Sequence, residues 1–178
     1  MAEEQSEETK VEAREFMKGL VGSAPESTYE FKGGDGINMD ALRTLYTDNK
    51  SQLMENFWTM YDPTQTSIWT CSYDEGDSNE DLEQTIAITT EFMKQTESIK
   101  AHCFGIMHTL DNLEIRGLWI FNDANPESLY GVNEDSSWFT FSQLGPEPNE
   151  YVKKAVSDLL VPEDDKLDSK TIKHSQIL

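Results

Sequence analysis

The pattern of apolar and polar residues predicts several β-strands in the second half of the chain. From Phe57 onward the period shortens to two residues, and residues 67–73 place Trp69, Cys71 and Tyr73 on one face, as in a strand buried mainly on that side. Residues 101–110 and 113–121 are the most apolar segments. The Asp111-Asn112 pair between them predicts a tight antiparallel hairpin at the middle of a sheet.

Each strand of the predicted hairpin contains a glycine, and two further segments are expected to add strands to the sheet. Gly105 and Gly117 interrupt the hairpin strands and predict a close approach of the backbone to a neighbour. Residues 138–141 predict one more short strand. The apolar residues at 82, 86 and 88 also keep a two-residue period, so we expect a strand there. Thr89 or Thr90 then caps a helix that carries residues 92, 93 and 99 inward.

Elsewhere apolar residues recur at the helical spacing of three or four positions. A loosely amphipathic helix is predicted at residues 11–20, followed by a flexible stretch that includes residues 33–36. Asn38 and Asn149 are suited to cap helices. The apolar faces of those two helices consist of Met39, Leu42, Leu45 and Tyr46 for the first, and Val152, Ala155, Val156, Leu159 and Leu160 for the second.

Together these elements predict an α+β fold in which an antiparallel sheet has helices packed around it. The length of 178 residues suits a single domain. We expect residues 1–24 to be an acidic extension with a possible helix and residues 25–160 to be the folded domain. Residues 161–178 are expected to be a polar tail outside the fold, and a free disordered tail is the favoured interpretation of its end.

Charge narrows the kinds of partner. The formal net charge is −20, from 34 acidic and 14 basic residues. Residues 74–83 carry six acids and no base, and residues 122–150 carry another six acids and no base. Phosphate binding depends on clustered Lys and Arg, so we expect no direct contact with nucleic acid and favour a basic protein as partner. For the acidic runs themselves, a solvated surface is the favoured interpretation, and docking to a basic partner is the alternative.

The N-terminus and the cysteines favour a cytoplasmic protein. The chain begins without a basic and apolar leader, and no segment approaches the length of a membrane span, so we expect no membrane association. Cys71 and Cys103 both fall in apolar, strand-like segments, where reduced thiols pack as small hydrophobic groups.

The sequence contains no complete catalytic or metal-binding pattern. His102 and His108 lie roughly 20 Å apart if they belong to one strand, and Cys103 then faces the other way, so the three residues cannot hold one ion. The acidic segment 77–82 has Leu82 where a calcium loop needs glycine, and residues 33–36 lack the Lys of a phosphate-binding loop. We therefore expect no enzyme activity, cofactor, metal or small-molecule substrate.

The candidate partner-contact residues are one tryptophan and five acids. Trp58 follows Phe57, and adjacent residues of a strand face opposite ways, so Trp58 is either packed in the core or offered to a partner. The acids belong to the loop after residue 73, where they are free to meet a basic surface. They are Asp74, Glu75, Asp77, Glu80 and Asp81.

Several short motifs resemble, in order and spacing, the C-terminal domain of the gamma subunit of eukaryotic translation elongation factor 1. They are Pro25-Glu26-Ser27-Thr28-Tyr29, Phe57-Trp58 followed by Asp62 and Ser67-Ile68-Trp69, and Gly117-Leu118-Trp119-Ile120-Phe121. Gln84-Thr85, at the start of the expected strand, and the segment 135–138, before the last strand, agree with the same order. The resemblance covers about residues 25–160, nearly the whole expected domain.

The resemblance implies an α+β domain without a catalytic centre, and a scaffold role in the nucleotide-exchange complex of translation elongation. The expected partners are then elongation factor 1 subunits. Only about 24 residues precede the motif at residue 25, so we expect the chain to lack the glutathione-transferase-like domain that family members carry there. It also departs from the family in a basic run reduced to Lys94 and Lys100, and in acids at residues 163–165 where the family end is basic. The alternative function is a stand-alone acidic interaction module recruited to another cytoplasmic assembly.

Overall fold

One antiparallel sheet organises the part of the chain that this computed structural model describes, residues 30–178. Residues 31–178 form one compact unit. The sheet has six strands in the order β4-β1-β3-β2-β6-β5, and every neighbouring pair is antiparallel. The strands are β1 (Ser67–Tyr73), β2 (Cys103–Leu110), β3 (Ile115–Phe121), β4 (Phe139–Leu144), β5 (Lys166–Leu167) and β6 (Lys170–Ile177).

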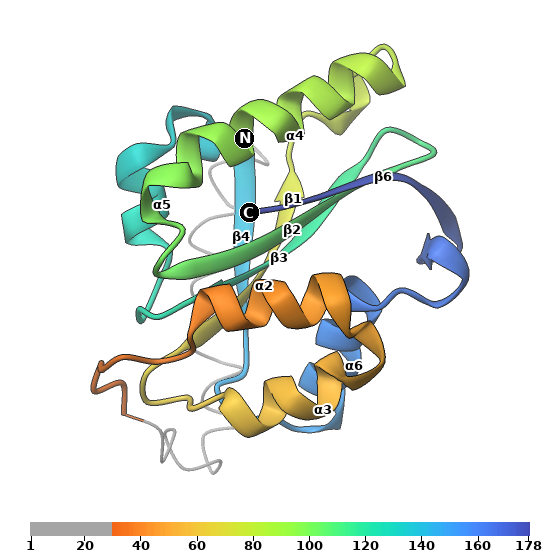
Figure 1. The fold of residues 1–178 in the computed structure, drawn as a ribbon. Coiled ribbons are helices and arrows are strands. Elements are labelled where there is room, and N and C mark those ends of the chain that lie inside the picture. Colours follow the sequence, from red (N-terminus) through yellow and green to blue (C-terminus); the bar gives the residue numbers. More distant parts are fainter. Residues whose placement is uncertain (1–29) are drawn as a thin grey trace, which may run out of the picture. The chain divides into compact units, whose positions relative to one another are not determined.

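Helices cover both faces of this sheet (Figure 1). The described α-helices are α2 (Met39–Asp48), α3 (Lys50–Met60), α4 (Leu82–Thr96), α5 (Glu127–Val132) and α6 (Glu150–Leu160). Helices α4 and α5 lie on one face, and α2, α3 and α6 lie on the other. The predicted α+β fold with an antiparallel sheet and surrounding helices is confirmed. The helix predicted at residues 11–20 and the motif at residues 25–29 lie outside the described residues.

Two apolar cores result, one on each face, because side chains alternate along every strand. Ile68 of β1 packs in the first core, under α2, α3 and α6, whereas Cys71 packs in the second, under α4 and α5. The expectation that β1 is buried mainly on one side is therefore wrong. Trp69 and Tyr73 are only half-buried at the margin of the second core, and the fully buried tryptophan is Trp119.

The β2–β3 hairpin occupies the middle of the sheet, as predicted. All eight residues of β2 are buried. Its two glycines allow close contacts: a Cβ on Gly105 would lie 2.4 Å from the Trp119 ring, and one on Gly117 would lie 2.5 Å from the Met107 sulfur. The close backbone approach predicted at these two positions is confirmed.

Residues 82–88 are helical, not a strand, and the predicted cap at Thr89 or Thr90 is wrong. Helix α4 begins at Leu82 because the Asp81 side chain caps it, accepting a hydrogen bond from the Gln84 N–H at 2.7 Å. Three of its buried residues are threonines at helical spacing, Thr85, Thr89 and Thr96. Each hydroxyl donates to a carbonyl of the preceding turn at 2.8 Å. A prediction based on the spacing of apolar residues alone does not detect this buried face of α4, because its threonines are polar.

Residues 57 and 58 also belong to a helix. Helix α3 runs to Met60, and Leu53 and Phe57 point into the first core four positions apart. The two-residue period expected from Phe57 begins only after the turn at Asp62, whose carboxylate accepts hydrogen bonds from the Thr64 N–H and hydroxyl. Phe57 and Trp58 therefore do not lie on opposite sides of a strand.

The C-terminal segment is part of the sheet and not a polar tail. Strand β6 pairs with β2 from Ile106 opposite Ile177 onward, and the Leu178 N–H donates to the Gly105 carbonyl at 2.9 Å. Without β6, the backbone groups of the buried strand β2 that face away from β3 would be unpaired. Main-chain pairing needs no apolar pattern, which explains why the polar sequence of β6 did not predict it.

The glycine-rich stretch before α2 is fixed, although the sequence predicted a flexible linker. Gly33, Gly34 and Gly36 all have positive φ angles, which favour glycine. The Asn122 side chain accepts from the Ile37 N–H at 3.0 Å and donates to the Ile37 carbonyl at 2.7 Å. Asn122 directly follows β3, so this side chain fastens the loop to the end of a central strand.

Candidate functional site

The five predicted contact acids lie together in the loop between β1 and α4. Asp74 and Asp81 have structural roles: Asp74 hydrogen-bonds Thr140 of β4, and Asp81 caps α4. Glu75, Asp77 and Glu80 are exposed, and none of them forms an ion pair within the described residues. These three side chains are available to a partner.

In the folded chain this loop lies beside part of the second acidic run, residues 134–138, although the two segments are far apart in sequence. The Asp74 N–H donates to the Trp138 carbonyl at 2.9 Å, so the loop starts beside the beginning of β4. Burial, together with the carboxylates of Glu75 and Asp135, raises the pKa of the Tyr73 hydroxyl. Glu75 and Asp135 therefore lie within electrostatic reach of one tyrosine, although they are far apart in sequence. We call the surface formed by residues 74–81 and 134–138 together with β4 the acidic edge.

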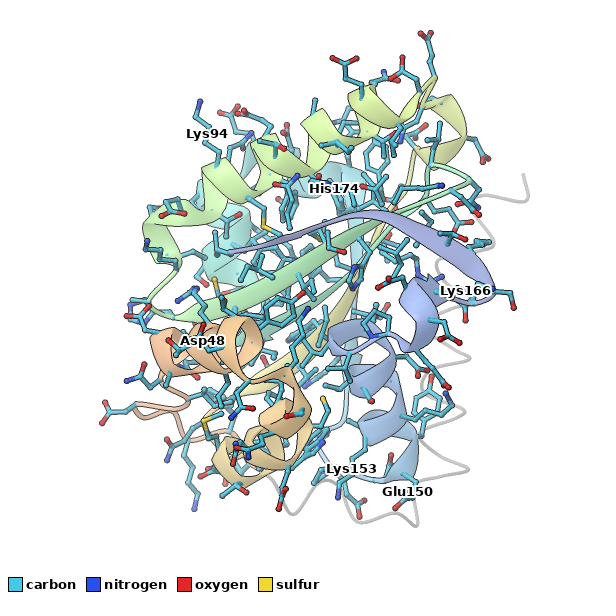
Figure 2. All side chains as sticks on the ribbon, turned by 45° about the vertical axis from the view of Figure 1, so that its right-hand side comes forward. Asp48, Lys94, Glu150, Lys153, Lys166 and His174 are labelled. Carbon is cyan, nitrogen blue, oxygen red and sulfur yellow. The ribbon has the colours of Figure 1, made fainter. Side chains whose placement is uncertain are left out.

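Basic residues are absent from the segments that build the acidic edge. There is no Lys or Arg between Lys50 and Lys94, or between Arg116 and Lys153. In Figure 2, Lys94 lies toward the end of α4, and Lys153 lies on α6. Lys94 is about 18 Å along the helix from its first residue. Arg116 is already paired with Asp168 at 2.9 Å. The carboxylates of the acidic edge are therefore not neutralised by these bases.

Trp58 does not belong to the acidic edge. It is half-buried on α3 against the first core, in edge-on contact with Phe57 at 4.8 Å and Tyr61 at 5.5 Å. The ammonium of Lys153 lies 5.8 Å from the centre of its ring. Trp58 is thus neither fully buried nor fully exposed to a partner. It lies on α3, whereas the predicted contact acids lie in the loop before α4.

The most exposed large side chains near the acidic edge were missed by the sequence reasoning. Trp138 is 53% exposed and Tyr130 is 47% exposed. The Tyr130 ring lies edge-on to Phe141 of β4, with ring centres 5.7 Å apart. Aromatic residues in or beside a strand usually belong to the hydrophobic core, and the sequence pattern therefore assigned Trp138 to the last predicted strand. The acidic and polar residues 134–137 that precede Trp138 were the sequence signal for its exposure.

The histidines and cysteines offer no catalytic arrangement in the described region. His102 lies exposed in the turn before β2, so it shares no strand with the buried His108. His108 is held by Ser175 at 2.7 Å and by the Leu159 carbonyl at 2.6 Å. Burial raises the pKa of the Cys103 thiol to about 12, which keeps it protonated and unreactive. Residues 30–178 contain no group of three His, Cys, Asp or Glu side chains placed to hold a metal.

A cavity of about 350 Å³ lies at the start of α2, lined by residues 35–40 with Ala101 and His102. It contains none of the predicted contact residues. Its walls include the backbone held by Asn122 and two carboxylates, and no Lys or Arg lines it. Among the helices of the described chain, none combines the length and apolar character that crossing a membrane requires.

The residues that carry the family resemblance are structural where the structure describes them. Phe57, Ile68 and Trp119 are fully buried, and Asp62 forms the turn before β1. Comparison with known protein families supports the same resemblance. Residues 25–125 match the model of the elongation factor 1 gamma conserved domain.

The relatives are plant proteins. The chain is 26% identical to elongation factor 1-gamma of Prunus avium over 119 residues, which are 63% of this chain and 28% of that protein. It is 27% identical over 119 residues, with the same coverage, to elongation factor 1-gamma 3 of Oryza sativa subsp. japonica. It is 30% identical over 90 residues to probable elongation factor 1-gamma 2 of Arabidopsis thaliana, covering 47% of this chain and 22% of that protein.

The chain thus spans less than a third of the length of the relatives it matches. The family match ends at residue 125. The strands β4, β5 and β6, which complete the same sheet, and helix α6, which covers one of its faces, therefore follow the matched region in sequence. Because the matched region covers more than half of the chain and includes β1, α4 and the central hairpin, the protein belongs to the elongation factor 1 gamma family through its conserved domain.

Proposed function

We propose that this protein is a non-catalytic scaffold module of translation elongation, acting in the cytoplasm, and that its acidic edge docks a basic surface of another elongation factor 1 subunit. Family membership supports the link to elongation. The observation that carries the docking role is the meeting of two acidic runs at one end of the sheet without a basic residue in either. A surface of this kind attracts a positively charged protein and disfavours nucleic acid.

The absence of catalysis is part of this proposal. The groups at the acidic edge are exposed carboxylates and aromatic rings, and the buried nucleophile candidates Cys71 and Cys103 have raised thiol pKa values because burial disfavours the thiolate. Contact through a charged face needs only exposed side chains on a rigid support, which the sheet and α4 provide.

The test compares two triple charge reversals of the full chain. The edge variant is Glu75→Lys, Asp77→Lys and Glu80→Lys. The control variant, Asp48→Lys, Glu55→Lys and Glu163→Lys, changes the net charge equally at exposed positions on other elements; Figure 2 shows Asp48 at the end of α2. Isothermal titration calorimetry with purified elongation factor 1 subunits should show binding that weakens at least about tenfold in the edge variant.

The control variant should bind within about twofold of the natural chain, and raising the salt concentration should weaken all measurable binding because surface charges are screened. Equal loss of binding in both variants would show a non-specific effect of net charge. Lack of binding to any elongation factor 1 subunit, with stable recovery of another cytoplasmic complex, would favour the alternative of an interaction module outside elongation.

A further inference from the structure

Strand β4 ends the sheet with an edge that carries none of the usual protective features. It is the first strand in the order β4-β1-β3-β2-β6-β5, so only β1 pairs with it. Its sequence, FTFSQL, contains no charged residue and no proline, and its register with β1 is continuous from Phe139 to Leu144. Edge strands normally carry lysine, proline or a bulge that prevents pairing with other chains.

The direction of the free backbone groups follows from two hydrogen bonds. The Asp74 N–H donates to the Trp138 carbonyl, and the Thr70 hydroxyl donates to the Ser142 carbonyl at 3.3 Å. The backbone N–H and C=O groups therefore point toward β1 at residues 138, 140, 142 and 144. By alternation, those of Phe141 and Gln143 point outward, away from the sheet. Within residues 30–178 these outward groups have no hydrogen-bond partner.

The surroundings of this edge select for positive charge. Carboxylates of Glu75, Glu134 and Asp135 lie at the end of the sheet where β4 begins, and neither acidic run contains a base. The exposed rings of Trp138 and Tyr130 flank the strand and offer apolar and cation–π contacts to long side chains. A second copy of this chain would itself carry a net charge of −20 and would be repelled by these carboxylates.

We propose that β4 accepts an extended, Lys- and Arg-containing segment of a partner protein as a seventh strand of the sheet. The outward groups of Phe141 and Gln143 form the main-chain hydrogen bonds, and the acidic edge pairs with the basic side chains. This inference rests on the proposed function and specifies how the partner is held, so the two are tested separately.

The test uses the full chain and a capped synthetic octapeptide of alternating lysine and valine, at an ionic strength of about 20 mM, where charge attraction is strong. Amide hydrogen exchange, followed by NMR, reports the edge directly. Peptide binding should slow exchange of the Phe141 and Gln143 amides at least about tenfold at saturation, because strand addition buries these N–H groups in hydrogen bonds.

A matched pair of variants isolates the backbone contribution. Gln143→Pro removes an outward N–H and leaves the pairing with β1 intact, since proline is tolerated at such positions of edge strands. Gln143→Thr changes the same side chain and keeps the N–H. The proline variant should bind the peptide about fivefold more weakly than the threonine variant, the effect of one net hydrogen bond. Circular dichroism checks that both fold, and if the proline variant does not, the exchange result decides.

The outcomes separate the two proposals. Unchanged exchange at residues 141 and 143, with equal affinity for both Gln143 variants, would overturn strand addition and leave docking by charge alone. Failure of the peptide to bind the natural chain would also overturn it, whereas the proposed function depends on the calorimetry with elongation factor 1 subunits. Formation of dimers in the absence of peptide, seen by analytical ultracentrifugation, would identify a second copy as the occupant.

Discussion

At the scale of single residues, a glycine decides whether the central tryptophan fits. The Trp119 ring lies between Phe92, with ring centres 5.5 Å apart, and Phe121, at 6.1 Å, and its Nε1 is 3.3 Å from the Met107 sulfur. Gly105 faces this ring from the neighbouring strand. Because the ring is enclosed on all these sides, it cannot move away from a new methyl group.

Replacing Gly105 with alanine should lower the free energy of unfolding by about 1–3 kcal/mol, since the added Cβ would lie 2.4 Å from ring carbons. Urea denaturation followed by tryptophan fluorescence measures the loss. Gly131→Ala is the control, because a Cβ there meets no atom within 4 Å and alanine favours the α5 helix. An unchanged urea midpoint for Gly105→Ala would contradict the packing argument.

His108 links three elements through a neutral ring. With hydrogen on Nε2, the ring donates to the Leu159 carbonyl at the end of α6 and accepts from the Ser175 hydroxyl of β6. Burial lowers the pKa of His108 below its ordinary value of 6.5; the hydrogen bond to Leu159 opposes this shift, and Lys50 adds to it. The unfolded chain consequently binds a proton at a higher pH than the folded chain does.

His108 should therefore make folding stability fall as the pH drops below about 6.5, by at most about 1.4 kcal/mol per pH unit. Its contribution is complete above the unfolded pKa and is lost toward the lower folded pKa. Urea midpoints at pH 7.5 and pH 5 for the natural chain and for His108→Gln measure the effect. The variant should show the smaller change between the two pH values, and an identical change would rule out His108 as the group responsible.

At the scale of elements, the acidic loop and helix α4 share a residue. Asp81 is both a predicted contact acid and the N-cap of α4, and it lies at the positive end of the helix dipole. Helix α4 supports the second core through Phe92 and Met93. A charge change at Asp81 therefore affects stability and surface charge together, unlike one at Asp77.

Substitutions at these two positions can separate the effects. Asp81→Ala should cost about 0.5–2 kcal/mol of stability by removing the cap, whereas Asp81→Asn should stay close to the natural chain because asparagine caps equally well. Asp77→Ala should leave thermal stability unchanged, since its exposed carboxylate forms no hydrogen bond within the described residues. Differential scanning calorimetry on the three variants tests this order, and equal stability of all three would show that the cap does not matter.

At the scale of the whole molecule, a net charge of −20 makes the folded chain repel itself. The repulsion is not uniform, because the exposed acids after β1 lie beside those before β4, and neither run contains a base. The basic partner proposed above would relieve this repulsion on binding, which would add to the attraction between the two proteins.

The melting temperature of the isolated chain should rise by a few degrees between about 50 and about 500 mM NaCl, as salt screens the like charges. The edge variant with lysines at residues 75, 77 and 80 should show a smaller rise than the control variant with lysines at 48, 55 and 163, although both carry the same net charge. Equal salt dependence would mean that the repulsion is spread over the surface.

Local patterns determined the strands and helices whose buried faces are apolar. The β1 and β2–β3 strands, the caps at Asn38 and Asn149, and the close contacts at Gly105 and Gly117 all follow from neighbours in sequence. The family resemblance was readable for the same reason, because its described motif residues are core positions such as Phe57 and Trp119.

Only the tertiary structure decided the elements and surfaces that depend on distant partners. The buried threonines of α4 are satisfied by carbonyls of their own helix, and β6 is held by backbone pairing with β2; neither leaves an apolar pattern in the sequence. The acidic edge exists because Asp74 and Trp138, 64 positions apart, share a hydrogen bond. The sequence by itself thus determined the fold class and the family and predicted a basic partner, whereas the place where that partner is proposed to bind required strand pairing, which is a long-range property of the folded chain.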